Sequence, residues 1–174
     1  MRPLVTVAHL LLLMLILLIV GSTEKVMGQG TDNKESYKLI KEVMDRGSRI
    51  LTAMEKNDLE IVKVDIDLVG MIESKYVLKV FNYGDPTQKH YTYVITAIGQ
   101  PSRISLLNIE VYHMLPSGNP RFVTRSESLN ANPTVTVDMT DREAGSYQIV
   151  IIVTKMFPGM ENWMGYYFLA IAHN

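Results

Sequence analysis

Histidines and serines are the residues through which this sequence could perform acid–base or nucleophilic chemistry. Beyond the apolar N-terminal run, the histidines are His90, His113 and His173. A hydrolytic site needs a nucleophile activated by a histidine and an orienting carboxylate. Ser146 lacks that setting, because the Gly-x-Ser-x-Gly pattern of a nucleophile elbow occurs nowhere in the chain. We therefore expect no catalytic residue, histidines at the surface or at strand ends, and a protein that is not an enzyme.

Two groups of carboxylates have the close spacing that a Ca²⁺ site requires. They are Asp65 with Asp67, and Asp138 with Asp141 and Glu143. Neither group has the spacing of an EF-hand loop or its glycine. In a strand, Asp65 and Asp67 share one face, and charge on that face is typical of a strand surface in water.

Three methionines form the other candidate ligand set. Met156, Met160 and Met164 recur every fourth residue, and thioethers suit copper(I). Pro158 and Gly159 break any helix that would align them, so packing as adaptable apolar side chains is the simpler interpretation. We expect neither a metal site nor a cofactor.

The same segment, residues 156–164, is the best candidate for an interaction. It connects the two most apolar stretches, which predicts a hairpin, and it holds the only tryptophan of the chain. Apolar residues stand where polar turn residues are usual, and exposed apolar loops mark contacts with partners. Phe157, Met160, Trp163 and Met164 are therefore the candidate interaction residues. The alternative is that the loop folds back and caps one end of the fold.

A helix over residues 34–56 is the first element expected to position these residues. Asp32 followed by Glu35 has the form of an N-cap with its reciprocal partner, and Gly47 lies on the apolar stripe. The helix covers a sheet or, alternatively, mediates self-association. Its apolar residues recur at three-and-four spacing: Tyr37, Ile40, Val43, Met44, Ile50, Leu51 and Met54.

After residue 57 the apolar period becomes two, which indicates strands. Glycine- and proline-containing clusters separate short runs without intervening helices, as in an antiparallel β-sandwich or barrel. The run 149–153 is apolar at every position and must be central, and the closing run pairs with it or lies across the core from it. The expected strands are 62–68, 76–81, 91–98, 104–114, 121–124, 134–138, 147–155 and 163–172.

Four of these segments carry short motifs of a known family. The motifs are Tyr-Thr-Tyr-Val-Ile-Thr-Ala at 91–97, Leu-Asn-Ile-Glu-Val-Tyr at 107–112, Ala-Gly-Ser-Tyr-Gln-Ile at 144–149 and Gly-Tyr-Tyr-Phe-Leu-Ala at 165–170. In this order they resemble the bacterial pre-peptidase C-terminal (PPC) domain.

The resemblance covers residues 67–172 and implies a fold and a role. It implies an eight-stranded, jelly-roll-like sandwich in a secreted protein, used as a non-catalytic accessory or binding module. The family has an Asp-x-Asp-Leu strand, and this chain has Asn108 and Glu110 at the acidic positions. This departure puts in doubt a calcium or polar-ligand role for the two residues.

The N-terminus predicts export. Residues 4–20 are apolar except for Thr6 and His9, and a polar stretch follows, as in a secretory signal. The best cleavage pattern ends at Gly28, so the mature chain would begin at Gln29. The alternative is a retained anchor over residues 4–20, since 17 residues span about 25 Å of a hydrocarbon core about 30 Å thick.

Composition excludes several classes of protein. The 174 residues contain no cysteine and carry a net charge of −1. There is thus no disulfide scaffold and no thiolate chemistry, and the basic surface that nucleic acid requires is missing. No usable Asn-x-Ser/Thr site is present, since Asn132-Pro133-Thr134 has proline in the excluded position. Together with the apolar N-terminus and the missing cysteines, this suits a bacterial periplasmic or secreted protein.

We expect three parts: a signal peptide at 1–28, a linker and amphipathic helix at 29–57, and a β-sandwich domain at 58–174. The expected function is that of a non-catalytic binding module, which contacts a protein or a glycan through loop 156–164 or a sheet face. The alternative is a structural or assembly protein of the cell envelope that uses helix 34–56 for self-association or tethering. Membrane contact is expected only through an uncleaved N-terminal segment.

Overall fold

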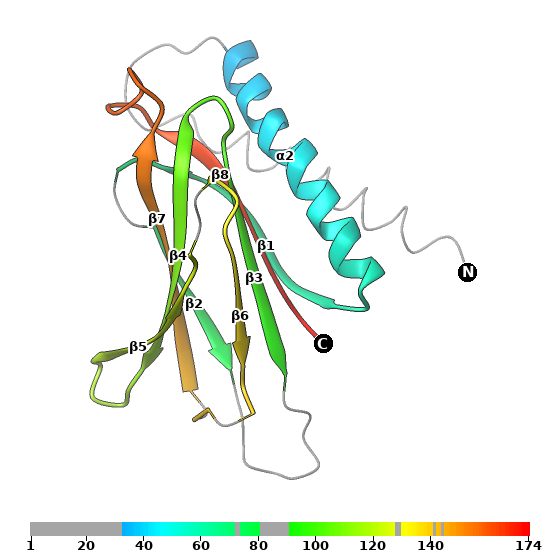
Figure 1. Ribbon diagram of the computed structural model, residues 1–174, viewed down its shortest axis with the longest axis vertical. Coiled ribbons are helices and arrows are strands. Elements are labelled where there is room, and N and C mark those ends of the chain that lie inside the picture. Colours follow the sequence, from blue (N-terminus) through cyan, green and yellow to red (C-terminus); the bar gives the residue numbers. More distant parts are fainter. Residues whose placement is uncertain (1–32, 72–73, 81–90, 128–129, 141, 144) are drawn as a thin grey trace. The chain divides into compact units, whose positions relative to one another are not determined.

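The computed structural model describes residues 33–71, 74–80, 91–127, 130–140, 142–143 and 145–174 (Figure 1). The expected signal peptide, Asp32, His90 and Asp141 lie outside these ranges. The helix and all eight strands lie where the periodicity predicts them. They are α2 (Asn33–Lys56), β1 (Glu60–Val69), β2 (Ser74–Val80), β3 (Thr92–Gly99), β4 (Ile104–Met114), β5 (Pro120–Arg125), β6 (Thr134–Asp138), β7 (Gly145–Met156) and β8 (Gly165–His173).

The strands form two sheets of four strands each. Sheet A has the order β1-β8-β3-β6, and sheet B has the order β2-β7-β4-β5. All the strand pairs are antiparallel. This exchange of consecutive strands between two sheets is the arrangement of a jelly roll, so the predicted mainly β, jelly-roll-like sandwich is confirmed.

Most connections between the described strands cross from one sheet to the other. Only β4 and β5 are neighbours both in the sequence and in a sheet, and Gly118 in their turn has a φ of 81°. The predicted hairpin at 156–164 is wrong. Strand β7 already has β2 and β4 as neighbours, and β8 has β1 and β3, so the two cannot pair. The loop between them instead crosses one end of the sandwich.

The main core lies between the sheets. Strand β4 alternates buried and half-buried residues, with Leu107, Ile109 and Val111 facing inward. From sheet A, Leu169 and Ile171 on β8 belong to the same cluster. The alternation follows from the pleat, which sends successive side chains to opposite faces. The apolar β7 is central, as predicted for a strand apolar at successive positions.

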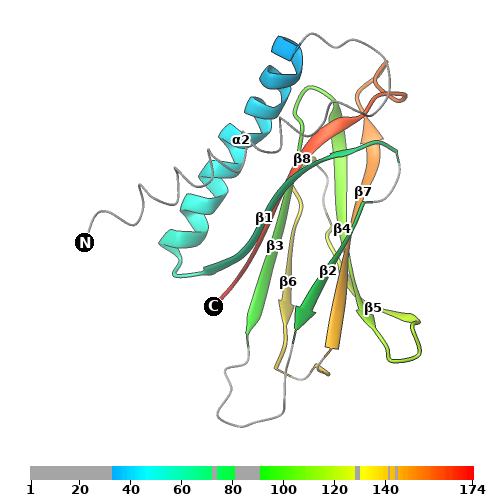
Figure 2. The same cartoon turned by 180° about the vertical axis from the view of Figure 1, so that it is seen from behind.

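A second core lies between sheet A and α2, which packs on β8, β1 and β3 (Figures 1 and 2). Val43 and Met54 of the helix are buried against Phe168, Ala170 and Ala172 on the outer face of β8. Of the two roles expected for the helix, the structure shows that it covers a sheet. These apolar side chains are therefore not exposed for self-association.

Gly47 allows this close packing. A Cβ atom at this position would lie 2.5 Å from Cδ2 of Phe168. The ring of Phe168 therefore fills the space that any other residue would occupy. In the sequence this glycine is expected to destabilise the helix. In the structure it lets the Phe168 ring of β8 pack directly against the helix backbone.

Candidate interaction surfaces

The loop between β7 and β8 is folded into consecutive turns. The backbone N–H of Met160 donates to the carbonyl of Phe157 at 2.9 Å, and that of Trp163 donates to the carbonyl of Met160 at 2.9 Å. Gly159 supplies the left-handed conformation, with a φ of 82°. Because the loop satisfies its own backbone groups, it holds a defined shape at the end of the sandwich.

The four predicted interaction residues divide into two groups. Met160 is half-buried and packs on the inter-sheet core, so it caps the sandwich. Phe157, Trp163 and Met164 have exposed fractions of 42%, 43% and 45%. Met160 therefore caps the sandwich, as the alternative interpretation expects, while an interaction through Phe157, Trp163 and Met164 stays a prediction.

Arg103, in the turn between β3 and β4, supports the exposed part of the loop. Its guanidinium lies 5.1 Å from the centroid of the Trp163 ring, a cation–π distance. Nη1 donates to the carbonyl of Met164 at 2.6 Å, and Nη2 lies 4.0 Å from a carboxylate oxygen of Glu35 on α2. One side chain thus joins the loop to the first turn of the helix.

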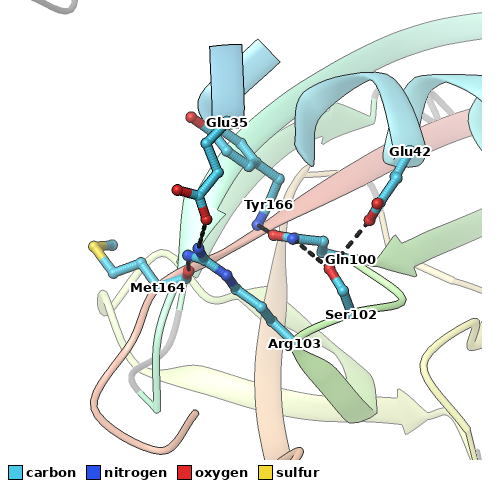
Figure 3. A network of polar contacts seen from close by, with 7 residues as sticks. All are labelled: Glu35, Glu42, Gln100, Ser102, Arg103, Met164 and Tyr166. Atoms are coloured by element: carbon cyan, nitrogen blue, oxygen red, sulfur yellow. Dashed lines mark hydrogen bonds and ion pairs between the residues drawn. The ribbon is translucent and has the colours of Figure 1, made fainter. Parts of the chain in front are cut away.

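Gln100 fixes the base of the same region (Figure 3). It is fully buried, and its Oε1 accepts a hydrogen bond from the backbone N–H of Tyr166 at 3.1 Å. Its Nε2 donates to Ser102 at 2.8 Å, and the Ser102 hydroxyl donates to Glu42 of α2 at 3.1 Å. Burial raises the pKa of the Tyr166 hydroxyl, an effect that nearby Arg103 partly offsets.

The end of β1 adds a further apolar side chain to this end of the sandwich. Val69 pairs with Gly165, so β1 ends where β8 begins. Met71 is 52% exposed, and the Cβ position of the adjacent Gly70 lies 3.9 Å from Cγ of Met164. We call the exposed side chains of Met71, Phe157, Trp163 and Met164 the apolar tip.

The outer face of sheet B has a different chemistry. Tyr112 on β4 lies opposite Gln148 on β7 and Phe122 on β5. The Tyr112 and Phe122 rings meet edge to face, with centroids 5.7 Å apart, and Tyr112 donates a hydrogen bond to Glu110. Phe122 is 53% exposed, while Glu110 and Gln148 are half-buried. We call these four residues, with Asn108 on the same face of β4, the aromatic row.

His113 lies near the end of β4, as expected for a strand-end histidine, and it is buried there. The side chain is 2% exposed and its ring stacks on Tyr147, with centroids 4.7 Å apart. Nδ1 lies 3.1 Å from a guanidinium nitrogen of Arg121 and 3.7 Å from Glu143. A Cβ at Gly145 would lie 2.8 Å from Nε2, so this glycine, with a φ of 151°, makes room for the ring.

His173 is also buried near a strand end. It is 8% exposed and lies beside Tyr91 and Tyr93, with ring centroids 4.1 and 5.4 Å away. Its Nε2 is 3.9 Å from Glu60. Among the residues that the structure describes, the polar and ring contacts of His113 and His173 involve no serine or threonine, so these contacts assemble no nucleophile–base pair.

Asp65 and Asp67 have a structural role at the edge of sheet A. Each accepts a hydrogen bond from the backbone N–H of the next residue, Ile66 at 2.9 Å and Leu68 at 2.7 Å. Strand β1 is an edge strand, and edge N–H groups invite pairing with another chain. Because the two aspartates accept hydrogen bonds from the N–H groups of Ile66 and Leu68, these groups are less available to a strand of another chain.

The other candidate ligand sets do not converge. In the described ranges, no group of three or more histidine, aspartate or glutamate residues is placed to hold a metal ion. Met156 is buried in the core, Met160 is half-buried and Met164 is exposed, so the three thioethers face different surroundings.

The interior offers little space for a ligand. A void of about 10 Å³ lies between the sheets, lined by Tyr93, Val111 and Ile149 among others. Pockets for small molecules have volumes of about 300 Å³ or more. The two surfaces described above are therefore better candidates for binding than this void.

Comparison with known proteins gives a similarity in structure but none in sequence. No family model matches the sequence, and no curated protein matches it. Among solved structures, the chain is similar to the crystal structure of the Yersinia pseudotuberculosis-derived mitogen, with 10% identity and a TM-score of 0.44. The similarity covers 65% of this chain and 85% of that one.

Among the residues that the structure describes, no helix is both long enough and apolar enough to cross a bilayer.

Arg103, Gln100 and the aromatic row were not predicted from the sequence. Arg103 and Gln100 stand in a turn of ordinary composition, and the contacts with the helix and the loop arise only when distant segments meet. A sequence signal did exist for the row. Tyr112 and Phe122 are aromatic residues in consecutive predicted strands, and aromatic residues often pair across adjacent strands.

Proposed function

We propose that this chain is an exported, non-catalytic binding module that holds a glycan on the outer face of sheet B. The observation that carries the proposal is the aromatic row. An aromatic pair, an amide and a carboxylate lie on one face, across three paired strands. Helix α2 packs on the other sheet, and no helix among the described residues packs on this face.

The chemistry of the row suits a sugar. One side of a pyranose ring presents C–H groups that pack on an aromatic ring, while its hydroxyl groups donate and accept hydrogen bonds. Phe122 offers an exposed ring, and Gln148 and Asn108 can both donate and accept. The bond from Tyr112 holds the Glu110 carboxylate in place, so a ligand would meet groups that are already oriented.

Export and the absence of catalysis belong to the same proposal. Support comes from the apolar residues 4–20, from a chain without cysteine, and from histidines packed against tyrosine rings. The resemblance to the PPC domain, an accessory module of secreted proteins, favours the same role.

Sedimentation with insoluble peptidoglycan, chitin and cellulose tests the proposal. Phe122→Ala should weaken binding about tenfold, equivalent to about 1.4 kcal/mol, and Gln148→Ala should also weaken it. Val62→Ala, at an exposed position on β1, is the matched control and should bind as the unchanged chain does. Equal binding by all variants, or binding to no polysaccharide, would refute the glycan proposal. A protein captured by the unchanged chain and lost with Phe122→Ala would replace the glycan by a protein partner.

A further inference from the structure

The apolar tip is a second surface without a role in the binding of a glycan. Its four side chains come from two segments of the chain and are each 42–52% exposed. They lie together because β1 ends beside the start of β8 and Met164 lies near Gly70. Exposed apolar side chains gathered at one end of a folded protein mark a contact with another apolar surface.

The tip is held in place from below. Arg103 supports the Trp163 ring and the Met164 carbonyl, and its own carbonyl accepts the backbone N–H of Phe157 at 2.9 Å. Arg103 itself is only 12% exposed. The apolar side chains therefore stay outward because the polar groups beneath them are already satisfied.

The position of the helix indicates what covers the tip. Glu35, in the first turn of α2, lies 4.0 Å from Arg103, so the described part of the chain begins at the same end as the tip. Figure 3 shows the two residues side by side. The preceding sequence holds the apolar run 4–20, followed by residues 21–32. Those twelve residues can span at most about 40 Å.

We propose that the apolar tip rests on the surface of a lipid bilayer in which residues 4–20 are retained as an anchor. A bilayer that holds this run lies within about 40 Å of the end of the sandwich where α2 begins. Tryptophan favours the boundary between headgroups and acyl chains, where its ring is buried and its N–H stays solvated. Met71, Phe157 and Met164 supply apolar contact around it. The aromatic row lies on a sheet face, away from this end, and remains open to its own ligand.

A single tryptophan makes the proposal directly testable. Trp163 is the only one in the chain, so its fluorescence reports on the tip alone. The full chain is reconstituted into vesicles of phosphatidylethanolamine and phosphatidylglycerol. Lipids with brominated acyl chains should quench the Trp163 emission, and iodide in the water should quench it less than it quenches the chain unfolded in urea.

Paired variants separate a tip contact from the anchor. Phe157→Ser with Met71→Ser should shift the Trp163 emission to longer wavelength and reduce its quenching by brominated lipid. Phe122→Ser, at an equally exposed aromatic on sheet B, should leave both readings unchanged. Circular dichroism should match for all three chains, because the substituted residues are exposed.

Two results would overturn the proposal. In the first, the chain floats with the vesicles but Trp163 is quenched by iodide and not by brominated lipid, which would place the tip in water. In the second, the chain does not associate with vesicles at all. Neither result bears on the polysaccharide test, so this inference and the proposed function fail independently.

Discussion

The outer faces of the two sheets start from similar strands and differ in what covers them. Each sheet has a central strand that is apolar on both faces, β8 in sheet A and β7 in sheet B. On sheet A, Phe168, Ala170 and Ala172 lie beneath α2. On sheet B, Val150 and Ile152 lie on the outer face of β7, buried and half-buried respectively, and no helix among the described residues lies over them.

The difference shows that apolar character alone does not place the helix. Ala170 and Ala172 are small and leave room for a helix to approach the sheet, and Gly47 receives the Phe168 ring. Sheet B has polar neighbours around its central strand, with Glu110 opposite Val150 and Asn108 opposite Ile152. The small residues on the outer face of sheet A and the polar residues on the outer face of sheet B together explain why the helix covers sheet A.

The largest effect should come from removing the ring that joins sheet A to the helix. Phe168 is 3% exposed, and Phe168→Ala should lower the free energy of unfolding by about 3–5 kcal/mol. Phe122→Ala on sheet B should change it by about 0.5 kcal/mol or less. Urea denaturation measures both. Similar losses for the two variants would show that the faces do not differ as described.

A smaller effect should follow from filling the space at Gly47. Gly47→Ala gains up to about 1 kcal/mol of helix propensity, but overpacking against Phe168 costs about 1–3 kcal/mol, so a net loss is expected. Adding Phe168→Leu should recover part of it, which a double-mutant cycle measures. If Gly47→Ala alone stabilises the protein, the helix is not seated on this ring.

The smallest effect should appear at alkaline pH. Burial raises the pKa of Tyr93 and Tyr147 between the sheets, and of Tyr166 beneath α2, above the ordinary value of 10.0. The unfolded chain then loses protons first, so stability should fall as the pH rises above 10. Urea curves at about pH 9 and pH 11, with absorbance titration of the phenols, measure the effect. Tyr147→Phe should show a smaller loss, and an unchanged or larger loss would contradict the assignment.

The periodicity of apolar residues and the turn clusters between them predicted the helix and the strands well. The strand over 104–114 is recognisable because its inward and outward residues differ in type, and the helix because its stripe has a period near 3.6. The sequence did not show whether β7 and β8 pair with each other. Two strands that are apolar on both faces can be neighbours in one sheet or central strands of two facing sheets. Only the number of neighbours available in each sheet decides between these arrangements.

The surfaces were predictable only in part. Loop 156–164 stands out in the sequence because of its composition, yet which of its side chains turn inward depends on the core that Met160 meets. His113 has no local sign of burial, because its cover comes from Arg121 and Tyr147 on two other strands. Contacts between segments far apart in the sequence leave no short-range pattern.

The central place of β8 in sheet A has a consequence for how the chain folds. Strands β1 and β3 both pair with β8 and not with each other, so sheet A cannot assemble until residues 165–173 have been synthesised. The surface that receives α2 is formed at the same late step. Pairing across such long separations is slow, because the entropy of closing the loops is lost before the contacts form. Sheet A and the surface that receives α2 are therefore completed together, only when β8 is available.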